Sequence, residues 1–323
     1  MTDRIDQLRD LIQFDIGKRG LASEPRQNLI NACPDDFRLA CESLAHHANS
    51  TLAVVTGFFI PTATPPAGET DGPLGALFLA RALTPLGIRV KLVTDAFCVQ
   101  AMEAGLKACN LDVPLIALPS PDRAASMSDA EYCQCLDGVT HLLAIERVGP
   151  NVDGRCHTMR GRDITDLMSP AHRLFESINP MGQVSGRDAA SAKPQAEIVT
   201  IGIGDGGNEI GMGKIPRDVI ARNIKNGDLV ACRTPAQHLI VCGISNWGAY
   251  ALAAGIMTLR GALFANASGS DLFDPARERQ ILEAMVAAGP LVDGVTGQQV
   301  ATVDGTTWEE YADILVKIGA FIK

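Results

Sequence analysis

Short apolar runs recur along the chain at intervals that suit β-strands separated by helices. The clearest run is T-L-A-V-V-T-G-F-F at residues 51–59, and a loop rich in Pro, Gly and Thr follows it. A helical pattern over residues 74–86 and another apolar run at 88–94 come next. Strand, loop, helix and strand within about 45 residues form a βαβ unit, whose two strands are parallel.

The same alternation continues towards the C-terminus and predicts the fold class. We expect further strands at residues 114–118, 141–145, 197–203 and 239–243. We expect further helices at residues 5–14, 35–48, 100–109, 129–136, 248–260, 276–287 and 308–317. This order predicts a layered α/β fold with a mostly parallel sheet and helices on both faces. We expect residues 1–323 to form a single domain, with a subdomain split near 185–194 as the alternative.

Composition and charge narrow the class of partner. The 323 residues carry a net charge of −9, and only 5% of them are aromatic. An acidic surface repels nucleic-acid phosphates and anionic lipids, so we expect neither nucleic acid nor a membrane as a partner. An anionic small molecule remains a possible substrate if the protein supplies a local group of arginines.

Cysteine usage and the apolar runs bear on the cellular location. The nine cysteines are odd in number and follow no disulfide framework, so we expect free thiols in a reducing compartment. Residues 1–6 mix charges and lack the apolar stretch of a signal peptide. No run of about 18 apolar residues is present. We therefore expect a cytoplasmic protein, and a homo-oligomer is compatible with the sequence.

The most informative segment is I-G-I-G-D-G-G-N-E-I-G-M-G at residues 201–213. Six glycines surround Asp205, Asn208 and Glu209, directly after the apolar run that ends near residue 203. Glycines such as Gly206 and Gly207 allow the backbone to approach a ligand closely. Carboxylate and amide oxygens suit a hard divalent cation or a substrate amine. The segment therefore predicts a small-molecule site.

The same segment also matches G-x-G-x-x-G, through Gly202, Gly204 and Gly207. A dinucleotide would place its pyrophosphate at the N-terminus of the helix that follows such a loop. Asp205 lies inside this loop and Glu209 lies where that helix is expected to start, so both would oppose an anion. An NAD(P)-dependent oxidoreductase therefore stays an alternative.

A second segment, residues 146–163, combines four arginines, several carboxylates and one histidine. Arginine can bind a carboxylate through two parallel hydrogen bonds. Glu146 and Asp153 can ligate a cation or act as a base, and His157 can carry a proton. The alternative is a solvated loop held by salt bridges.

Four polar segments follow predicted strands, and parallel strands bring such segments to one edge of the sheet. Two of them are the segments above. The other two contain Asp71, in E-T-D-G-P at 69–73, and Asp95, in V-T-D at 93–95. The predicted topology therefore places all four around one site.

These segments resemble the D-glutamate cyclase family, specifically its C-terminal catalytic-type domain. The most specific blocks are A-I-E-R-V-G-P-N-V-D-G at 144–154, H-T-M-R-G-R-D-I at 157–164 and G-D-G-G-N-E-I-G-M-G at 204–213. The resemblance covers the chain from the first predicted strand to the C-terminus. It implies conversion of D-glutamate to 5-oxo-D-proline and water, aided by Mn²⁺ or Mg²⁺.

The chemistry that the resemblance implies assigns roles to these residues. A cation on the γ-carboxylate would make that carbon a better electrophile and its oxygen a better leaving group. The expected metal ligands are Asp205, Asn208 and Glu209. The expected catalytic residues are Glu146, Asp153, His157 and Asp205. The expected substrate-binding residues are Arg147, Asn151, Arg155, Arg160, Asp71, Asp95, Gly206 and Gly207. A non-catalytic protein that binds an acidic metabolite is the remaining alternative.

Overall fold

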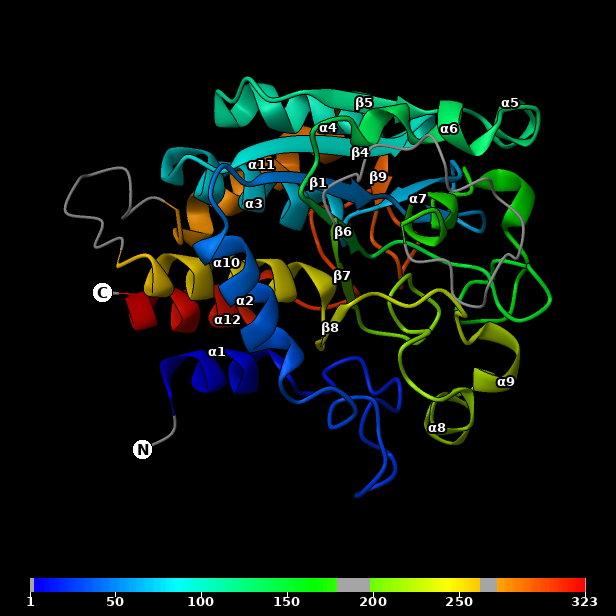
Figure 1. Ribbon diagram of the computed structural model, residues 1–323, viewed down its shortest axis with the longest axis horizontal. Coiled ribbons are helices and arrows are strands. Elements are labelled where there is room, and N and C mark those ends of the chain that lie inside the picture. The colour runs from blue at the N-terminus through cyan, green and yellow to red at the C-terminus, as the bar shows by residue number, and fades with distance from the viewer. Residues whose placement is uncertain (1–2, 179–197, 262–271, 323) are drawn as a thin grey trace, which may run out of the picture.

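Six parallel strands form the central sheet of the computed structural model, which describes residues 3–178, 198–261 and 272–322 (Figure 1). The strands are β1 (Thr51–Thr56), β4 (Arg89–Asp95), β5 (Leu115–Leu118), β6 (His141–Ile145), β7 (Val199–Gly204) and β8 (His238–Val241). Their order is β5-β4-β1-β6-β7-β8, and every pairing is parallel. The predicted split near residues 185–194 lies outside the described residues.

Alternate side chains of the sheet enter two different apolar cores. In β1, Leu52 and Val54 belong to one buried cluster, whereas Ala53 and Val55 belong to another. All six residues of β1 are buried, because helices cover both faces. This explains why the sequence shows a continuous apolar run here and no alternation of apolar and polar residues.

The larger of these two cores lies under the long helices. The second core and a third apolar cluster lie under short helices. The helices that contribute to the larger core are α1 (Arg4–Ile12), α2 (Asp36–His46), α3 (Pro73–Leu83), α4 (Ala96–Cys109), α10 (Ser245–Leu259), α11 (Pro275–Ala288) and α12 (Trp308–Ile322). The opposite core takes side chains from α5 (Pro121–Ala125), α6 (Asp129–Tyr132) and α7 (His172–Glu176). A third cluster joins β8 to α8 (Arg217–Asn223) and α9 (Gly227–Val230). Three short 3-10 helices complete the described helical segments: η1 (Thr84–Leu86), η2 (Cys133–Leu136) and η3 (Thr165–Leu167).

The predicted α/β fold with a parallel sheet and helices on both faces is confirmed. A smaller sheet of order β2-β3-β9 was not predicted. It consists of β2 (Phe59–Ile60), β3 (Ala67–Glu69) and β9 (Leu291–Val292). Strands of two or three residues are too short to show a periodic pattern, so they could not be predicted from the sequence. This small sheet matters because Glu69 ends β3 at the rim of the main sheet.

Helices α3 and α10 begin side by side and cap each other. The side-chain carbonyl of Asn246 accepts hydrogen bonds from the backbone N–H groups of Gly72, at 2.9 Å, and Gly75, at 2.7 Å. In return, the Asp71 carboxylate accepts from the N–H groups of Ser245, at 2.9 Å, and Asn246, at 2.8 Å. Because N-terminal N–H groups otherwise lack partners, this exchange fixes both helix starts at one edge of the sheet.

All nine cysteines lie within the described residues, and each is a free thiol. In the part of the chain that the structure describes, every helix is too short or too polar to traverse a bilayer.

Candidate active site

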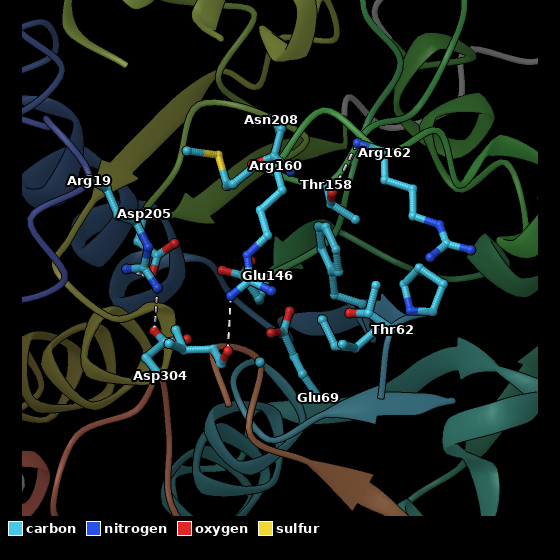
Figure 2. Close-up of a pocket in the computed structure, with 16 residues that line it drawn as sticks. Arg19, Thr62, Glu69, Glu146, Thr158, Arg160, Arg162, Asp205, Asn208 and Asp304 are labelled. Carbon is cyan, nitrogen blue, oxygen red and sulfur yellow. Dashed lines mark hydrogen bonds and ion pairs between the residues drawn. The ribbon is translucent and has the colours of Figure 1, made fainter. Parts of the chain in front are cut away.

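A pocket of about 140 Å³ opens beyond the C-terminal ends of β6 and β7 (Figure 2). It is lined by carboxylates, arginines and a few apolar side chains from five parts of the chain. The charged residues that line it are Glu69, Glu146, Asp205, Asp304, Arg19, Arg160 and Arg162. The two segments that the sequence singled out, near residues 150 and 205, therefore line one pocket.

Glu146 enters the pocket from the residue that follows β6. Its backbone has φ 44°, a left-handed conformation that is costly for a residue with a side chain. The conformation is held from two sides, because its N–H donates to the Ile203 carbonyl at 3.2 Å and its carboxylate accepts from Ser245 Oγ at 2.6 Å. Gly72 allows α3 to come close, since a Cβ there would lie 2.8 Å from the Glu146 Cβ. Such strain at a pocket residue is typical of functional sites.

The glycines after residue 201 allow the chain to fold back onto β7. A Cβ on Gly202 would lie 2.8 Å from the Gly211 Cα, and a Cβ on Gly204 would lie 2.9 Å from the Glu209 Cδ. The expected helix start at Glu209 is wrong, because residues 205–216 form turns and bridges and α8 begins at Arg217. A helix N-terminus that could receive a pyrophosphate is therefore missing from this described loop.

Asn208 and Glu209 are held in place by the backbone of the same turn. The Glu209 carboxylate accepts from the N–H groups of Asp205, at 3.0 Å, and Gly207, at 2.8 Å. The amide nitrogen of Asn208 donates to the His157 carbonyl at 2.8 Å, which ties the turn to the arginine-rich segment. The side-chain oxygen of Asn208 is buried and accepts no hydrogen bond from any described residue. A buried acceptor without a partner, on a side chain that lines the pocket, suggests a ligand there.

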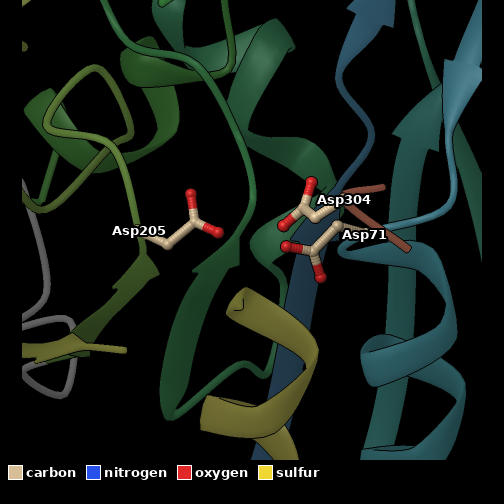
Figure 3. A group of neighbouring side chains, drawn as sticks. All are labelled: Asp71, Asp205 and Asp304. Atoms are coloured by element: carbon tan, nitrogen blue, oxygen red, sulfur yellow. The ribbon is translucent and has the colours of Figure 1, made fainter. Parts of the chain in front are cut away.

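Two groups of three carboxylates share Asp205. Asp71, Asp205 and Asp304 form one group (Figure 3), and Glu146, Asp205 and Glu209 form the other. In each group the nearest carboxylate oxygens all lie within 4.8 Å of one another. Oxygen atoms at such spacing can coordinate a divalent cation.

Arg19 lies between two members of the first group. Its guanidinium pairs with Asp205 and with Asp304, each at 2.8 Å, and also donates to the Gly243 carbonyl at 3.1 Å. Figure 2 shows Arg19 and Asp304 facing each other at one side of the pocket. The residue belongs to the irregular segment between α1 and α2, and sequence analysis did not single it out. The first carboxylate group therefore already has a cation, supplied by the protein itself.

Burial shifts the protonation of the pocket carboxylates. It is the main cause that raises the pKa of Glu69, with Asp304 and Asp71 adding to it, and it raises the pKa of Glu146, with Asp205 and Glu209 adding. Burial also raises the pKa of Asp71 to about 8. Carboxylates of this kind can hold a proton near neutral pH and can therefore exchange protons with an amine.

The comparisons with known proteins point to one family. A family model described as "D-glutamate cyclase-like, C-terminal" matches residues 8–319. The chain belongs to the D-glutamate cyclase-like family. It is 32% identical over 272 residues to the human protein named "D-glutamate cyclase, mitochondrial". This match covers 80% of the chain but only 39% of the human protein.

In this family member, the expected substrate-binding residues Arg147 and Asp95 bind each other. Arg147 is fully buried, pairs with the Asp95 carboxylate and donates to the carbonyls of Gly57, at 2.9 Å, and Ser169, at 2.6 Å. Asp95 also accepts from the Ser169 N–H at 3.0 Å. Neither residue is among those that line the pocket. The structure therefore places them beside the site as a buried ion pair.

The other expected residues of the 146–163 segment divide between the pocket and the surface. Arg160 lines the pocket and donates to the Val295 carbonyl at 2.9 Å. Arg155 and Asp153 are exposed, and Arg155 pairs with Asp163 at 2.6 Å. Asn151 is buried. Its side-chain oxygen accepts from the N–H groups of Asp153 and Arg155, and its amide nitrogen donates to the Leu229 carbonyl of α9.

The remaining expected residues lie close to the pocket without lining it. His157 is buried and its Nδ1 has no hydrogen-bond partner among the described residues, while its neighbour Thr158 lines the pocket. Gly206 allows a close approach, because a Cβ there would lie 2.7 Å from Met159 Sδ. Gly207 adopts φ 95°, which favours glycine. These residues shape the wall of the pocket.

Four of the charged residues that line the pocket had no predicted role. Glu69 was seen only as part of a loop, and Arg19, Asp304 and Arg162 were not assigned. Arg19 and Asp304 lie outside the segments that follow the main strands, so the sheet-edge argument did not reach them. The only available signal was the acidic loop that contains Glu69, whose position depends on the short strand β3.

Proposed function

We propose that this protein is a D-glutamate cyclase, which converts D-glutamate to 5-oxo-D-proline and water with the help of a divalent cation. The observation that carries the proposal is the pocket in which a carboxylate group suited to a cation lies beside carboxylates of raised pKa and a partly buried arginine. Membership of the family and the name of the human relative support the same reaction. The pocket size suits a small molecule.

We assign the cation, Mn²⁺ or Mg²⁺, to Glu146, Asp205 and Glu209, with the side-chain oxygen of Asn208. These donors are oxygens, which such cations prefer. The Asn208 oxygen lacks a partner among the described residues, and neither Glu146 nor Glu209 pairs with Arg19, which pairs with the shared Asp205 and with Asp304 of the other group. When bound, the cation would polarise the γ-carboxylate of the substrate and stabilise the departing oxygen.

The reaction moves two protons from nitrogen to oxygen. A bond forms between the α-nitrogen and the γ-carboxyl carbon, a carbon–oxygen bond breaks, and the departing oxygen leaves as water. Glu69 lines the pocket, and its raised pKa makes it a stronger base than an ordinary carboxylate. We therefore assign Glu69 to accept each proton from nitrogen and to pass it to the oxygen.

The test is incubation of the protein with D-glutamate and L-glutamate, with and without Mn²⁺, followed by chiral separation of the products. The account predicts 5-oxo-D-proline from D-glutamate, dependent on Mn²⁺ and abolished by a chelator. Saturable binding of glutamate without conversion under any cation would support the non-catalytic alternative and overturn the proposal. Turnover that survives complete removal of divalent ions would overturn the role of the metal.

Two further parts of the proposal concern the setting of the reaction. The substrate is a free small molecule, and the cytoplasm remains the location that the sequence predicts. The mitochondrial location in the name of the human relative belongs to that protein. Fractionation of cells that produce this chain tests the location directly.

A further inference from the structure

We propose that Arg19 binds the α-carboxylate of the substrate and so makes the site specific for amino acids that retain this group. The inference rests on the proposed cyclase function and assigns the substrate contact that function requires. The α-carboxylate survives the reaction unchanged, so a residue that binds it holds substrate and product in the same way. The γ-carboxylate is consumed and is assigned to the cation.

The contacts of Arg19 leave part of its guanidinium available to a ligand. A guanidinium has five N–H groups in one plane. Within the described residues, Arg19 bonds to Asp205, Asp304 and the Gly243 carbonyl, which accounts for three contacts. The side chain is 16% exposed and lines the pocket. The ion pairs therefore fix the plane of the guanidinium while an edge of it remains towards the pocket.

Arg19 differs from the other arginines of the pocket by its burial. Arg160 and Arg162 also line the pocket, but both are exposed. Water screens an exposed charge, whereas a buried charge interacts more strongly with an anion that enters beside it. A guanidinium keeps its positive charge in proteins, and Asp205 and Asp304 hold that of Arg19 at the pocket. The pocket is rich in carboxylates, so an anionic substrate needs such a cation.

A pair of lactams isolates this contact. 5-Oxo-D-proline and 2-pyrrolidinone share one ring and differ by the carboxylate that the reaction preserves. Their affinities for wild type, Arg19→Gln, Arg19→Lys and Arg160→Gln are measured by calorimetry at saturating Mn²⁺. Wild type is expected to prefer 5-oxo-D-proline by about 10–100-fold, the range of a charge-assisted pair. Arg19→Gln is expected to lose most of this preference, Arg19→Lys to retain part of it, and Arg160→Gln to change it less than about threefold.

Titration with Mn²⁺, followed by electron paramagnetic resonance, shows whether the variants keep the cation site. Arg19→Gln is expected to bind Mn²⁺ at least as tightly as wild type, because a positive neighbour of Asp205 has been removed. If the glutamine variant fails to fold, the lysine variant decides, since a preference equal to that of wild type would overturn the inference. A preference retained by folded Arg19→Gln, or lost in Arg160→Gln instead, would also overturn it.

Failure of the inference and failure of the proposed function give different results. If wild type turns over D-glutamate but Arg19→Gln keeps its preference for the carboxylate, only the role of Arg19 is wrong. If wild type neither turns over D-glutamate nor distinguishes the two lactams, the proposed function is wrong, and the inference falls with it.

Discussion

Two clusters of buried charge lie at the same edge of the sheet, and they differ in balance. In the first, Arg147 and Asp95 form one pair and also bond to nearby backbone groups, while Arg147 Nε has no partner among the described residues. In the second, the pocket carboxylates outnumber the one partly buried arginine that pairs with them, Arg19, and Asn208 has an acceptor without a partner among the described residues. A buried pair whose charges balance needs no further ion, whereas an excess of buried carboxylates is costly until a cation or proton arrives.

The first cluster belongs to the scaffold, and the second belongs to the candidate site. Both clusters come from polar residues at strand ends, so composition alone does not distinguish them. The distinction lies in whether the protein supplies the opposite charge. We call Arg147 with Asp95 the balanced pair and expect it to affect stability. We call the pocket carboxylates, with Asp205 at their centre, the unbalanced cluster and expect it to affect ligand binding and turnover.

The largest expected effect is the loss of turnover when the unbalanced cluster is changed. Asp205→Asn removes the carboxylate shared by both groups, and we expect turnover to fall by at least about 10³-fold, since a metal contributes several kcal/mol to the barrier. Mn²⁺ binding should fall in parallel, while the circular dichroism spectrum stays that of wild type. The exposed Asp228→Asn is the matched control. Full turnover in Asp205→Asn would discard the assignment of the site.

Next in size is the stability change when the balanced pair is broken. Arg147→Met leaves the Asp95 carboxylate buried and unpaired, so we expect a loss of about 3–5 kcal/mol in the free energy of unfolding. Urea unfolding measures it. The double variant Asp95→Asn with Arg147→Met should recover part of the loss, because the unpaired charge is then gone. A single variant as stable as wild type would show that the pair is not structural.

The main sheet, and the meeting of its strand ends at one edge, could be predicted from the sequence. Short strand-like segments predicted all six main strands, and parallel pairing then placed Glu146 and Asp205 at one edge. Contacts made by segments without a periodic pattern could not be predicted from the sequence. Arg19 reaches the pocket from an irregular segment, and Asp304 from the segment before α12.

Residue type also failed to show which arginines face a ligand. Arg147 and Arg160 belong to the same charged segment, yet one is fully buried in an ion pair and the other lines the pocket. That difference depends on the position of Asp95, which is far away in sequence. The glycine motif similarly predicted a helix at Glu209, but the glycines serve the close return of the chain onto β7.

A smaller change in stability is expected from Glu69→Gln, and this change depends on pH. Burial raises the pKa of Glu69 in the folded protein, so its contribution to stability is present at low pH and is lost as pH rises through the raised pKa. Glutamine resembles the neutral acid and avoids this loss. Without metal, the stability of the variant relative to wild type should therefore increase as pH rises through the raised pKa of Glu69. Turnover should be lost.

Thermal unfolding at several pH values, without metal, measures this difference. The exposed Glu103→Gln serves as the control and should leave the pH dependence as in wild type. If the stability of Glu69→Gln relative to wild type decreased as pH rises, the account would be contradicted, because the sign of the linkage would then be reversed.

The smallest expected effect concerns the surface arginine of the 146–163 segment. Arg155 is about half exposed, pairs with Asp163 and does not line the pocket. Exposed pairs contribute about 0–1 kcal/mol, so Arg155→Gln should change KM for D-glutamate less than about twofold. Steady-state kinetics measures this, with Arg19→Gln as the contrasting variant. A tenfold rise in KM for Arg155→Gln would return this residue to the substrate site.

The unbalanced cluster is tested most directly by anomalous diffraction from a crystal of the protein soaked in Mn²⁺. The account predicts a peak about 2 Å from carboxylate oxygens of Glu146 and Asp205, beside Glu209 and Asn208. A Mn²⁺ peak at a different place, with this carboxylate group still free of any cation, would contradict the central claim.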